Sequence, residues 1–285
     1  MSSVPRWLRR SRPVFTLYMP TVPFVLFALF PLYFMFVTSF KTNAELYDVS
    51  SVPFWIGRGV TFGHYELLSK ETFFWSWFVN SLMVSVAASA ISVVLGVLAA
   101  YPLARLKFPG AESFGVAIFI TYLVPPSLLF LSLSRVVAVL GLQDSTWSLV
   151  VIYPTITVPV SVWLLMGFLK AIPKDIEEQA MVDGYSRLGA FVRAVLPLAF
   201  PGIVAVVVFA FTLTASEFIY ALAFISPSTA KGVSTGVPTE LIRGDVFFWQ
   251  SLQAATVAVA VPIALVFNLF LDRFIAGFTM GAVKG

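Results

Sequence analysis

The residues best suited to chemistry or recognition lie in one charged segment between two long apolar runs, residues 174–197. Its distinctive members are Glu178, Ala180, Asp183, Gly184, Leu196 and Pro197. The chain has no cysteine, and its one histidine is His64, far away in the sequence. Disulfides, thiol nucleophiles and thiolate metal sites are therefore excluded, and the paired residues that a membrane-embedded enzyme needs are not found. We expect no catalytic residue, no metal and no other cofactor.

The composition is that of a membrane protein. Of the 285 residues, 59% are hydrophobic and only 11% are charged, whereas soluble domains carry about 25% charged residues. Six runs without charge are each long enough to cross a bilayer as a helix, which takes about 20 residues. We therefore predict an all-α, polytopic membrane protein with six transmembrane helices. The runs are Pro13–Phe40, Thr72–Ala104, Ser113–Ser134, Ser145–Leu169, Ala194–Ser216 with an extension to Ala230, and Val246–Leu271.

The basic residues predict the orientation. With the N-terminus inside, twelve of the 18 Lys and Arg residues fall in the cytoplasm, as the positive-inside rule requires. Both termini are then cytoplasmic in a multi-pass protein of the cell (inner) membrane, with the lipid bilayer as a partner and no nucleic acid. The predicted parts are an N-terminus (1–13), a six-helix domain (14–275) with a cytoplasmic loop (170–197) and external loops (41–71 and 226–250), and a C-terminal tail (276–285). His64 falls in the first external loop, where a solvated side chain is expected.

Residues that typically start and end helices divide the charged segment into two short helices. Pro173 suits the first turn of a helix, and Gly184 suits a left-handed C-terminal cap. Ser186 then reads as the N-cap of a second helix, which leads through Pro197 into the fifth span. Periodicity alone favours an amphipathic connector that rests on lipid headgroups. The exact residues allow a more specific interpretation.

The segment resembles the EAA loop of importer permeases of the ATP-binding-cassette (ABC) family. That motif has Glu-Ala-Ala, then Asp-Gly, then Leu-Pro after a fixed gap, and the six distinctive residues occupy the matching positions, with Gln179 in place of the middle Ala. The final residues, Gly281 to Gly285, and the pair Asn80-Ser81 resemble the second permease subunit of maltose-type carbohydrate importers. The resemblance implies a type I ABC importer permease fold.

The resemblance also implies a mechanism and partners. ATP-driven closure of two ATP-binding subunits would push the helix pair, with Glu178 as a polar anchor and Gly184 setting the angle between the helices. The C-terminal residues Val283, Lys284 and Gly285 would contact the same subunits. A second permease subunit would complete a heterodimer, and an extracytoplasmic solute-binding protein would deliver a carbohydrate. The chain has no phosphate-binding loop of its own, which agrees with ATP hydrolysis by partner subunits.

Three polar residues are candidates for lining a transport pathway: Glu217, Tyr122 and Asn268. A carboxylate within a span is expensive and suggests function, but Glu217 could instead pair with a neighbouring helix, and the other two could join helices by hydrogen bonds. The Pro125-Pro126 pair predicts either a simple kink or a break that lines a pathway. The segment 226–250, rich in Gly and Pro, is not expected to form a regular helix.

The predicted function is the membrane-spanning subunit of an ATP-driven importer of a mono- or oligosaccharide or a polyol. Two alternatives remain open at this level. The same class of importer could carry glycerol phosphate or another small solute. A six-span secondary transporter is the other alternative, although Glu217 is the one intramembrane charge that would suit ion coupling.

Overall fold

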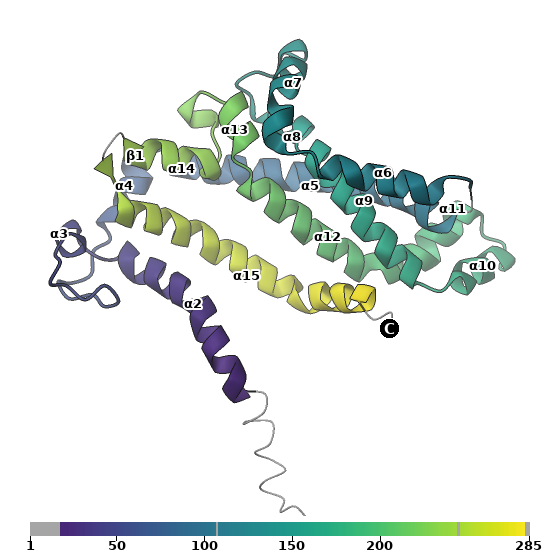
Figure 1. Ribbon diagram of the computed structural model, residues 1–285, viewed down its shortest axis with the longest axis horizontal. Helices are drawn as coiled ribbons and strands as arrows, with labels where there is room; N and C mark the ends of the chain where they lie inside the picture. The colour runs from purple at the N-terminus through teal and green to yellow at the C-terminus, as the bar shows by residue number, and fades with distance from the viewer. Residues whose placement is uncertain (1–17, 107, 244–245, 283–285) are drawn as a thin grey trace, which may run out of the picture. The chain divides into compact units, whose positions relative to one another are not determined.

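The computed structural model describes residues 18–106, 108–243 and 246–282. These residues are mainly helical, and the strands among them are one short antiparallel pair, β1 (Ile242–Arg243) with β2 (Val246–Phe247). The chain divides into two compact units. The first unit is Met1–Thr72 with Leu241–Val261, and the second is Phe73–Glu240 with Pro262–Gly285. Figure 1 follows the elements in chain order.

Five stretches of helix in the described residues are long and apolar enough to cross a membrane. Each coincides with one of the predicted spans, so the all-helical membrane architecture is confirmed. They are α2 (Met19–Ser39), α5 (Phe74–Arg105), α8 with α9 (Thr146–Ile152 and Pro154–Ala171), the run Arg187–Ser216 that ends in α12 (Leu196–Ser216), and the first part of α15 (Trp249–Ala282).

The third predicted span, Ser113–Ser134, is not one helix. The chain forms α6 (Ala111–Tyr122) and α7 (Pro126–Val139), and the two helices are bent by 92° at the break. Pro125 has an extended backbone with ψ 132°, and a residue that precedes proline is disfavoured in the helical region. The Pro pair therefore ends one helix and starts another, so the third span is interrupted at the predicted position.

The fifth span begins earlier and ends sooner than predicted. Helix α11 (Arg187–Ala190) passes through a π-helical turn, Phe191–Val195, directly into α12. The predicted extension to Ala230 is wrong, because the backbone turns extended at Glu217 (ψ 132°) and a separate helix, α13 (Ile219–Phe224), follows. The charge-free run itself ends at Ser216, where α12 ends, so the charge of Glu217 marks the break that the predicted extension passed over.

The segment 226–250 is more regular than its Gly and Pro content suggested. It contains a 3-10 turn (Ser228–Ala230) and the nine-residue helix α14 (Val233–Leu241). A side chain added at Gly236 would collide with the ring of Trp77 on α5. This glycine therefore permits close packing between α14 and α5. The expectation that the segment 226–250 forms no regular helix is therefore wrong over residues 233–241.

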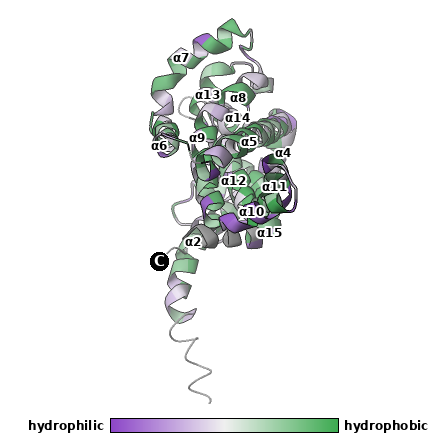
Figure 2. Cartoon of the chain, turned by 90° about the vertical axis from the view of Figure 1, so that its right-hand side faces the viewer, coloured by the Kyte–Doolittle hydropathy of each residue, from purple (hydrophilic) through white to green (hydrophobic). Residues whose placement is uncertain are grey.

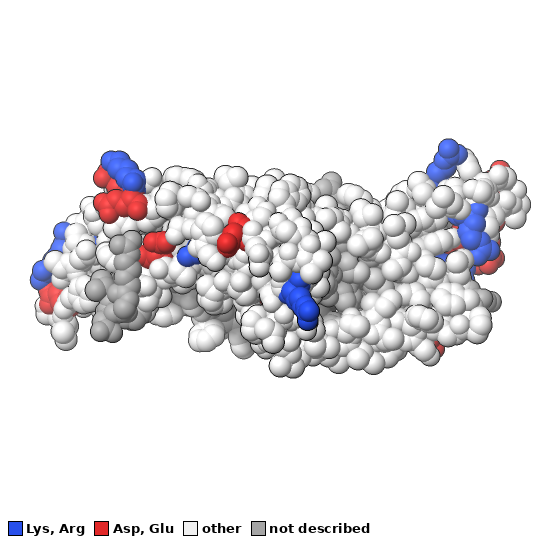
Figure 3. All heavy atoms as spheres, turned by 90° about the horizontal axis from the view of Figure 1, so that it is seen from above, with Lys and Arg blue, Asp and Glu red and all other residues white. Residues whose placement is uncertain are grey.

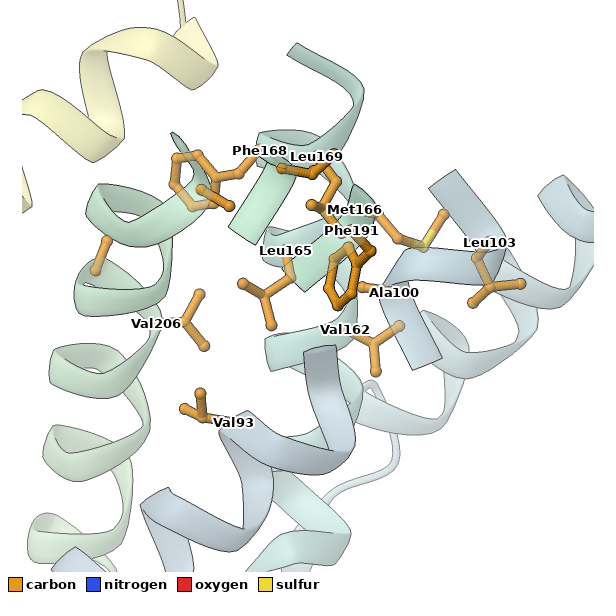
Figure 4. Close-up of a cluster of buried hydrophobic side chains, with 13 residues drawn as sticks. Val93, Ala100, Leu103, Val162, Leu165, Met166, Phe168, Leu169, Phe191 and Val206 are labelled. Carbon is orange, nitrogen blue, oxygen red and sulfur yellow. The ribbon is translucent and has the colours of Figure 1, made fainter. Parts of the chain in front are cut away.

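The core of the second unit is built on α5, which packs against α9 and α12 (Figure 4). Small residues allow the close approach: a Cβ at Gly96 would lie 3.0 Å from Cβ of Ser161, and one at Gly202 would collide with Phe168. Ser92 Oγ and Thr157 Oγ1 lie 2.5 Å apart between α5 and α9. Small interfacial residues with a few hydrogen bonds are how membrane helices associate.

The segment between α2 and α5, which is predicted to be the first external loop, is folded. It holds α3 (Asn43–Leu46) and α4 (Gly63–Glu71). His64 is buried on α4, where Nε2 lies 2.9 Å from the carbonyl oxygen of Lys41 and Nδ1 lies 3.1 Å from the hydroxyl of Ser251. The prediction of a solvated histidine is therefore wrong. The sequence around His64 is polar, but its hydrogen-bond partners come from residues 23 and 187 positions away.

Candidate coupling site

The charged segment folds as a helix, a sharp turn and a second helix. Helix α10 (Lys174–Val182) starts directly after Pro173, and its acidic residues Asp175 and Glu177 lie in the first turn, where they favour the positive end of the helix dipole. Pro173 therefore precedes the first turn and does not lie within it. In Figure 2 the hydrophilic residues of α10 contrast with the mostly hydrophobic helices around it.

Gly184 makes the turn possible. Its φ is +93°, a left-handed value that side chains disfavour. The N–H of Gly184 donates to the Met181 carbonyl and that of Tyr185 to the Ala180 carbonyl, both at 3.1 Å. These two bonds form a complete Schellman cap, which satisfies the last carbonyls of α10. The predicted C-terminal cap at Gly184 is thus present.

Ser186 starts the second helix as predicted. Its hydroxyl accepts a hydrogen bond from the backbone N–H of Gly189 at 3.2 Å, the usual geometry of an N-cap. From Arg187 the helical path continues without a break to Ser216. The turn at Gly184 is therefore joined mechanically to a membrane-spanning helix.

One side of the segment is anchored in the core. Ala180, Ala190, Phe191 and Val195 are buried, and the ring of Phe191 lies 4.1 Å from that of Tyr101 on α5. Figure 4 shows Phe191 among the side chains of α5 and α9. An apolar hollow of about 440 Å³ lies beside the start of α10, lined by residues that include Ile172, Ile176 and Leu198.

The opposite side is open. Val182, at the end of α10, is 88% exposed, and Leu188 is also exposed. Charged side chains gather over α10 and α11 at the right-hand end of Figure 3. Of the predicted site residues, Glu178, Asp183, Gly184 and Pro197 are exposed, Leu196 is half-buried and Ala180 is buried. The structure thus brings the motif residues onto a single element with a fixed base and a free outer surface.

Glu177 is a residue that the sequence analysis missed. It is buried. The hydroxyl of Tyr101 donates to its Oε1 at 2.6 Å, and Nε of Arg105 lies 3.8 Å from its Oε2. The spacing to Ala180 gives a partial signal, because residues three apart share a helix face. The partners on α5 lie more than seventy positions away, and local pattern cannot reveal them.

Glu217 has a structural task at the end of α12. Its carboxylate accepts hydrogen bonds from the N–H groups of Tyr220 (2.9 and 3.1 Å) and Ala221 (3.1 Å), so it caps α13. Tyr122 ends α6 half-buried beside Phe119, and Asn268 is exposed on α15. In the part of the chain that the structure describes, no hydrogen bond joins these three residues. Their role in a pathway stays a prediction.

The predicted C-terminal contact residues, Val283, Lys284 and Gly285, lie outside the described residues.

Comparison with known proteins agrees with this architecture. The model of the family "binding-protein-dependent transport system inner membrane component" matches residues 92–279. The chain is 33% identical over 265 residues to the inner membrane ABC transporter permease protein YcjP of Escherichia coli, covering 92% of this chain and 93% of that protein. It is 31% identical to the diacetylchitobiose uptake system permease protein DasC of Streptomyces coelicolor, covering 90% and 92%.

The fold is also that of a solved transporter subunit. A chain in the crystal structure of a bacterial ABC transporter involved in the import of the acidic polysaccharide alginate superimposes with a TM-score of 0.76. The match covers 96% of this chain and 100% of that chain, at 18% identity. The expected type I importer permease architecture is thereby confirmed.

Proposed function

The chain belongs to the family of binding-protein-dependent transport system inner membrane components, and from that premise we propose that it is the permease subunit of an ATP-driven sugar importer. The pair α10–α11 is its coupling element. In this proposal two ATP-binding subunits hydrolyse ATP, a second permease subunit completes the pathway, and a solute-binding protein delivers the substrate from outside. Both termini lie in the cytoplasm.

One observation carries the coupling assignment: the exposed turn at Gly184 is continuous with a membrane-spanning helix. A push on the outer surface of α10–α11 has a rigid path to follow, because α11, the π-helical turn and α12 form one helical run. Helix α12 in turn packs against α5 and α9. A displacement at the turn would therefore be passed to the helices that form the core of the second unit.

In this proposal some of the predicted site residues contact the ATP-binding subunit, and the others hold the helices in place. Glu178 and Asp183 lie on the exposed surface and would make polar contacts with an ATP-binding subunit. Gly184 sets the angle between the helices. Ala180 and Leu196, buried and half-buried, hold the element on the core, and Pro197 lies at the start of α12. The tail, Val283 to Gly285, would add a further contact with the same subunit.

A carbohydrate is the proposed substrate, a mono- or oligosaccharide or a polyol. The names of similar permeases support this class, since DasC belongs to a diacetylchitobiose uptake system. Thermal-shift screening of the cognate binding protein against sugars, polyols and glycerol phosphate tests it. Stabilisation by a sugar that also competes for uptake supports the proposal, and stabilisation by glycerol phosphate alone contradicts it.

Gly184→Pro tests the coupling assignment. Proline fixes φ near −65°, far from the +93° found here. The variant is expected to insert into the membrane normally but to lose transport-coupled ATP hydrolysis in the reconstituted complex. Gly141→Pro is the matched control, because Gly141 also has a positive φ (+67°) and open space around it but lies after α7. Normal coupling in Gly184→Pro, or equal loss in both variants, would contradict the assignment.

ATP dependence separates this proposal from a secondary transporter. Uptake into cells is expected to stop when ATP is depleted while ion gradients are held intact. Uptake that persists under those conditions and collapses with the gradients would identify a secondary transporter.

A further inference from the structure

Arg105 is a buried cation whose guanidinium makes no hydrogen bond within the described residues. It is the last residue of α5 and is 7% exposed. Among residues 18–106, 108–243 and 246–282, no group lies within hydrogen-bond reach of its Nε, Nη1 or Nη2. Nε lies 3.8 Å from Oε2 of Glu177, which is close enough for an ion pair but too far for a hydrogen bond. A buried charged group left in this state is costly, so we expect a partner that the described part of the chain does not supply.

The space for such a partner adjoins the guanidinium. A hollow of about 380 Å³ is lined by Arg105, Arg187 and four residues of α10: Lys174, Glu177, Glu178 and Met181. The four share one face of the helix, at the i, i+3, i+4 and i+7 positions. A water molecule takes about 30 Å³ of liquid, so the hollow has room for a ligand much larger than one water.

The charge of the lining favours an anion. Three cations, Arg105, Lys174 and Arg187, face two carboxylates, those of Glu177 and Glu178. The Glu177 carboxylate is already engaged by the hydroxyl of Tyr101. The lining of the hollow therefore carries more positive than negative charge.

We propose that this hollow binds a phosphate group, from an anionic lipid headgroup or from free phosphate. The planar guanidinium fork matches phosphate oxygens in a bidentate manner. Both Nη atoms of Arg105 are buried and have no hydrogen-bond partner among the described residues, so a phosphate reached by a turn of this side chain toward the hollow would satisfy them. Arg105 ends a membrane-spanning helix, which places it at the depth where basic residues meet lipid phosphates. A bound phosphate would join α5 to α10 and α11 and would hold the coupling element on the core.

Native mass spectrometry of the full chain in nanodiscs tests the proposal. Nanodiscs of phosphatidylcholine alone are compared with nanodiscs that also contain phosphatidylglycerol, and inorganic phosphate is titrated separately into the phosphatidylcholine sample. Arg105→Gln is expected to weaken phosphate-group binding about tenfold or more, the loss of one charge-assisted contact. Arg193→Gln is the matched control, because Arg193 stacks on Tyr185 and does not line the hollow.

Two further variants keep the test decisive if Arg105→Gln fails to fold. Arg187→Gln changes an exposed lining residue and is expected to weaken binding by a smaller factor. Glu177→Gln removes a competing negative charge and is expected to tighten binding, whereas a purely structural role for Glu177 predicts no gain. A loss of binding in Glu177→Gln would contradict the proposal.

The arms of the experiment identify the source. Retention of phosphatidylglycerol alone identifies a headgroup, and saturable binding of inorganic phosphate identifies the free anion; either outcome supports the proposal. Binding that falls equally in Arg105→Gln and Arg193→Gln overturns it. It is also overturned if neither probe binds. Protection of the guanidinium from chemical modification only when ATP-binding subunits are present would then assign the hollow to a protein carboxylate.

Discussion

Two buried carboxylates, Glu45 in the first unit and Glu177 in the second, are satisfied to different degrees. Glu45 accepts hydrogen bonds from two backbone N–H groups, and its ion-pair partner Lys41, 3.4 Å away, donates to a carbonyl of its own. Within the part of the chain that the structure describes, Glu177 receives one hydrogen bond, from Tyr101, and the guanidinium of its ion-pair partner Arg105 makes none. One network is closed within its own loop, and the other has unused donors.

The environment of Glu45 explains its ionisation. Burial alone raises the pKa of a carboxyl, but the N–H groups of Gly57 and Arg58, at 2.7 and 3.1 Å, and the ammonium of Lys41 outweigh it. The pKa of Glu45 therefore lies below its ordinary value of 4.5. The carboxylate stays charged and joins Lys41 to Gly57 and Arg58 within the folded segment 41–71.

The difference in hydrogen bonding suggests that the Lys41–Glu45 and Arg105–Glu177 networks have different roles. A closed network needs no partner, so the Lys41–Glu45 cluster is structural and gives the segment 41–71 one conformation. An open network leaves a charge for something outside the chain. The open network lies next to the coupling element, which is where the proposed function requires partners. The following variants test this contrast from the largest expected effect to the smallest.

Glu45→Gln is expected to cost about 3–5 kcal/mol of unfolding free energy, because it leaves Lys41 buried without its counter-charge. Thermal unfolding of the purified chain in detergent measures it. The control is Glu66→Gln, since Glu66 pairs with Lys70 at an exposed site (side chains 67% and 74% exposed) and should cost about 0–1 kcal/mol. Equal effects in the two variants would refute a structural role for the buried pair.

Acid should remove the same stabilisation. The folded-state pKa of Glu45 is lowered, so its contribution is fully present above the unfolded-state pKa, about 4.3 for Glu. The contribution is lost as the pH falls through the still lower folded-state pKa. Unfolding temperatures of the parent chain and Glu45→Gln are compared from pH 7 to pH 3. The gap between them should narrow below about pH 4.3, and a constant gap would contradict the assignment.

Tyr101→Phe removes the one hydrogen bond to the Glu177 carboxylate. Hydrogen bonds to charged groups contribute about 1.5–3 kcal/mol, and a loss of that size in unfolding free energy is expected. Tyr33→Phe is a useful control, because its hydroxyl donates to an exposed carbonyl, that of Phe54. A larger loss in Tyr33→Phe would mean that Glu177 gains little from its partner.

Gly184→Ala should destabilise the chain by roughly 1–2 kcal/mol, since a left-handed backbone is strained for residues with a Cβ. Gly167→Ala is matched in space, because an added Cβ meets nothing within 4 Å at either site. Gly167 lies within α9, where alanine is the better helix former, so no loss is expected there. Equal stability of the two variants would show that the turn tolerates another conformation.

The smallest effect is expected from replacing the open pair. Arg105→Met combined with Glu177→Met and Tyr101→Phe, so that no hydroxyl is left without its acceptor, should change stability by less than about 1 kcal/mol or increase it in neutral lipid without phosphate, as apolar replacement of buried pairs often does. Lys41→Met with Glu45→Met should be clearly destabilising, because the N–H groups of Gly57 and Arg58 lose their acceptor. A larger loss of stability on replacing the Arg105–Glu177 network than on replacing the Lys41–Glu45 pair would contradict this contrast between the two networks.

The sequence predicted the parts of the coupling element that depend on local chemistry. Gly184 ends α10 through its own backbone conformation, and Ser186 starts α11 through its own side chain. Both caps could therefore be predicted from the sequence. The burial of Glu177 and of His64 was not, because both depend on partners far away in the chain. The role of Gly236 could not be predicted either, because it depends on the ring of Trp77. The rule that glycine disfavours a helix therefore gave the wrong prediction for this segment.

The central claim is that the outer surface of α10–α11 meets an ATP-binding subunit. The chain has no cysteine, so one introduced thiol is unique. Val182→Cys and Val139→Cys are matched, since these valines lie at the ends of α10 and α7 and are 88% and 82% exposed. In membranes with the assembled transporter, a short thiol cross-linker should join Val182→Cys, but not Val139→Cys, to a polypeptide that a photoreactive ATP analogue labels. Cross-linking of that polypeptide to Val139→Cys alone, or to neither variant, would contradict the account.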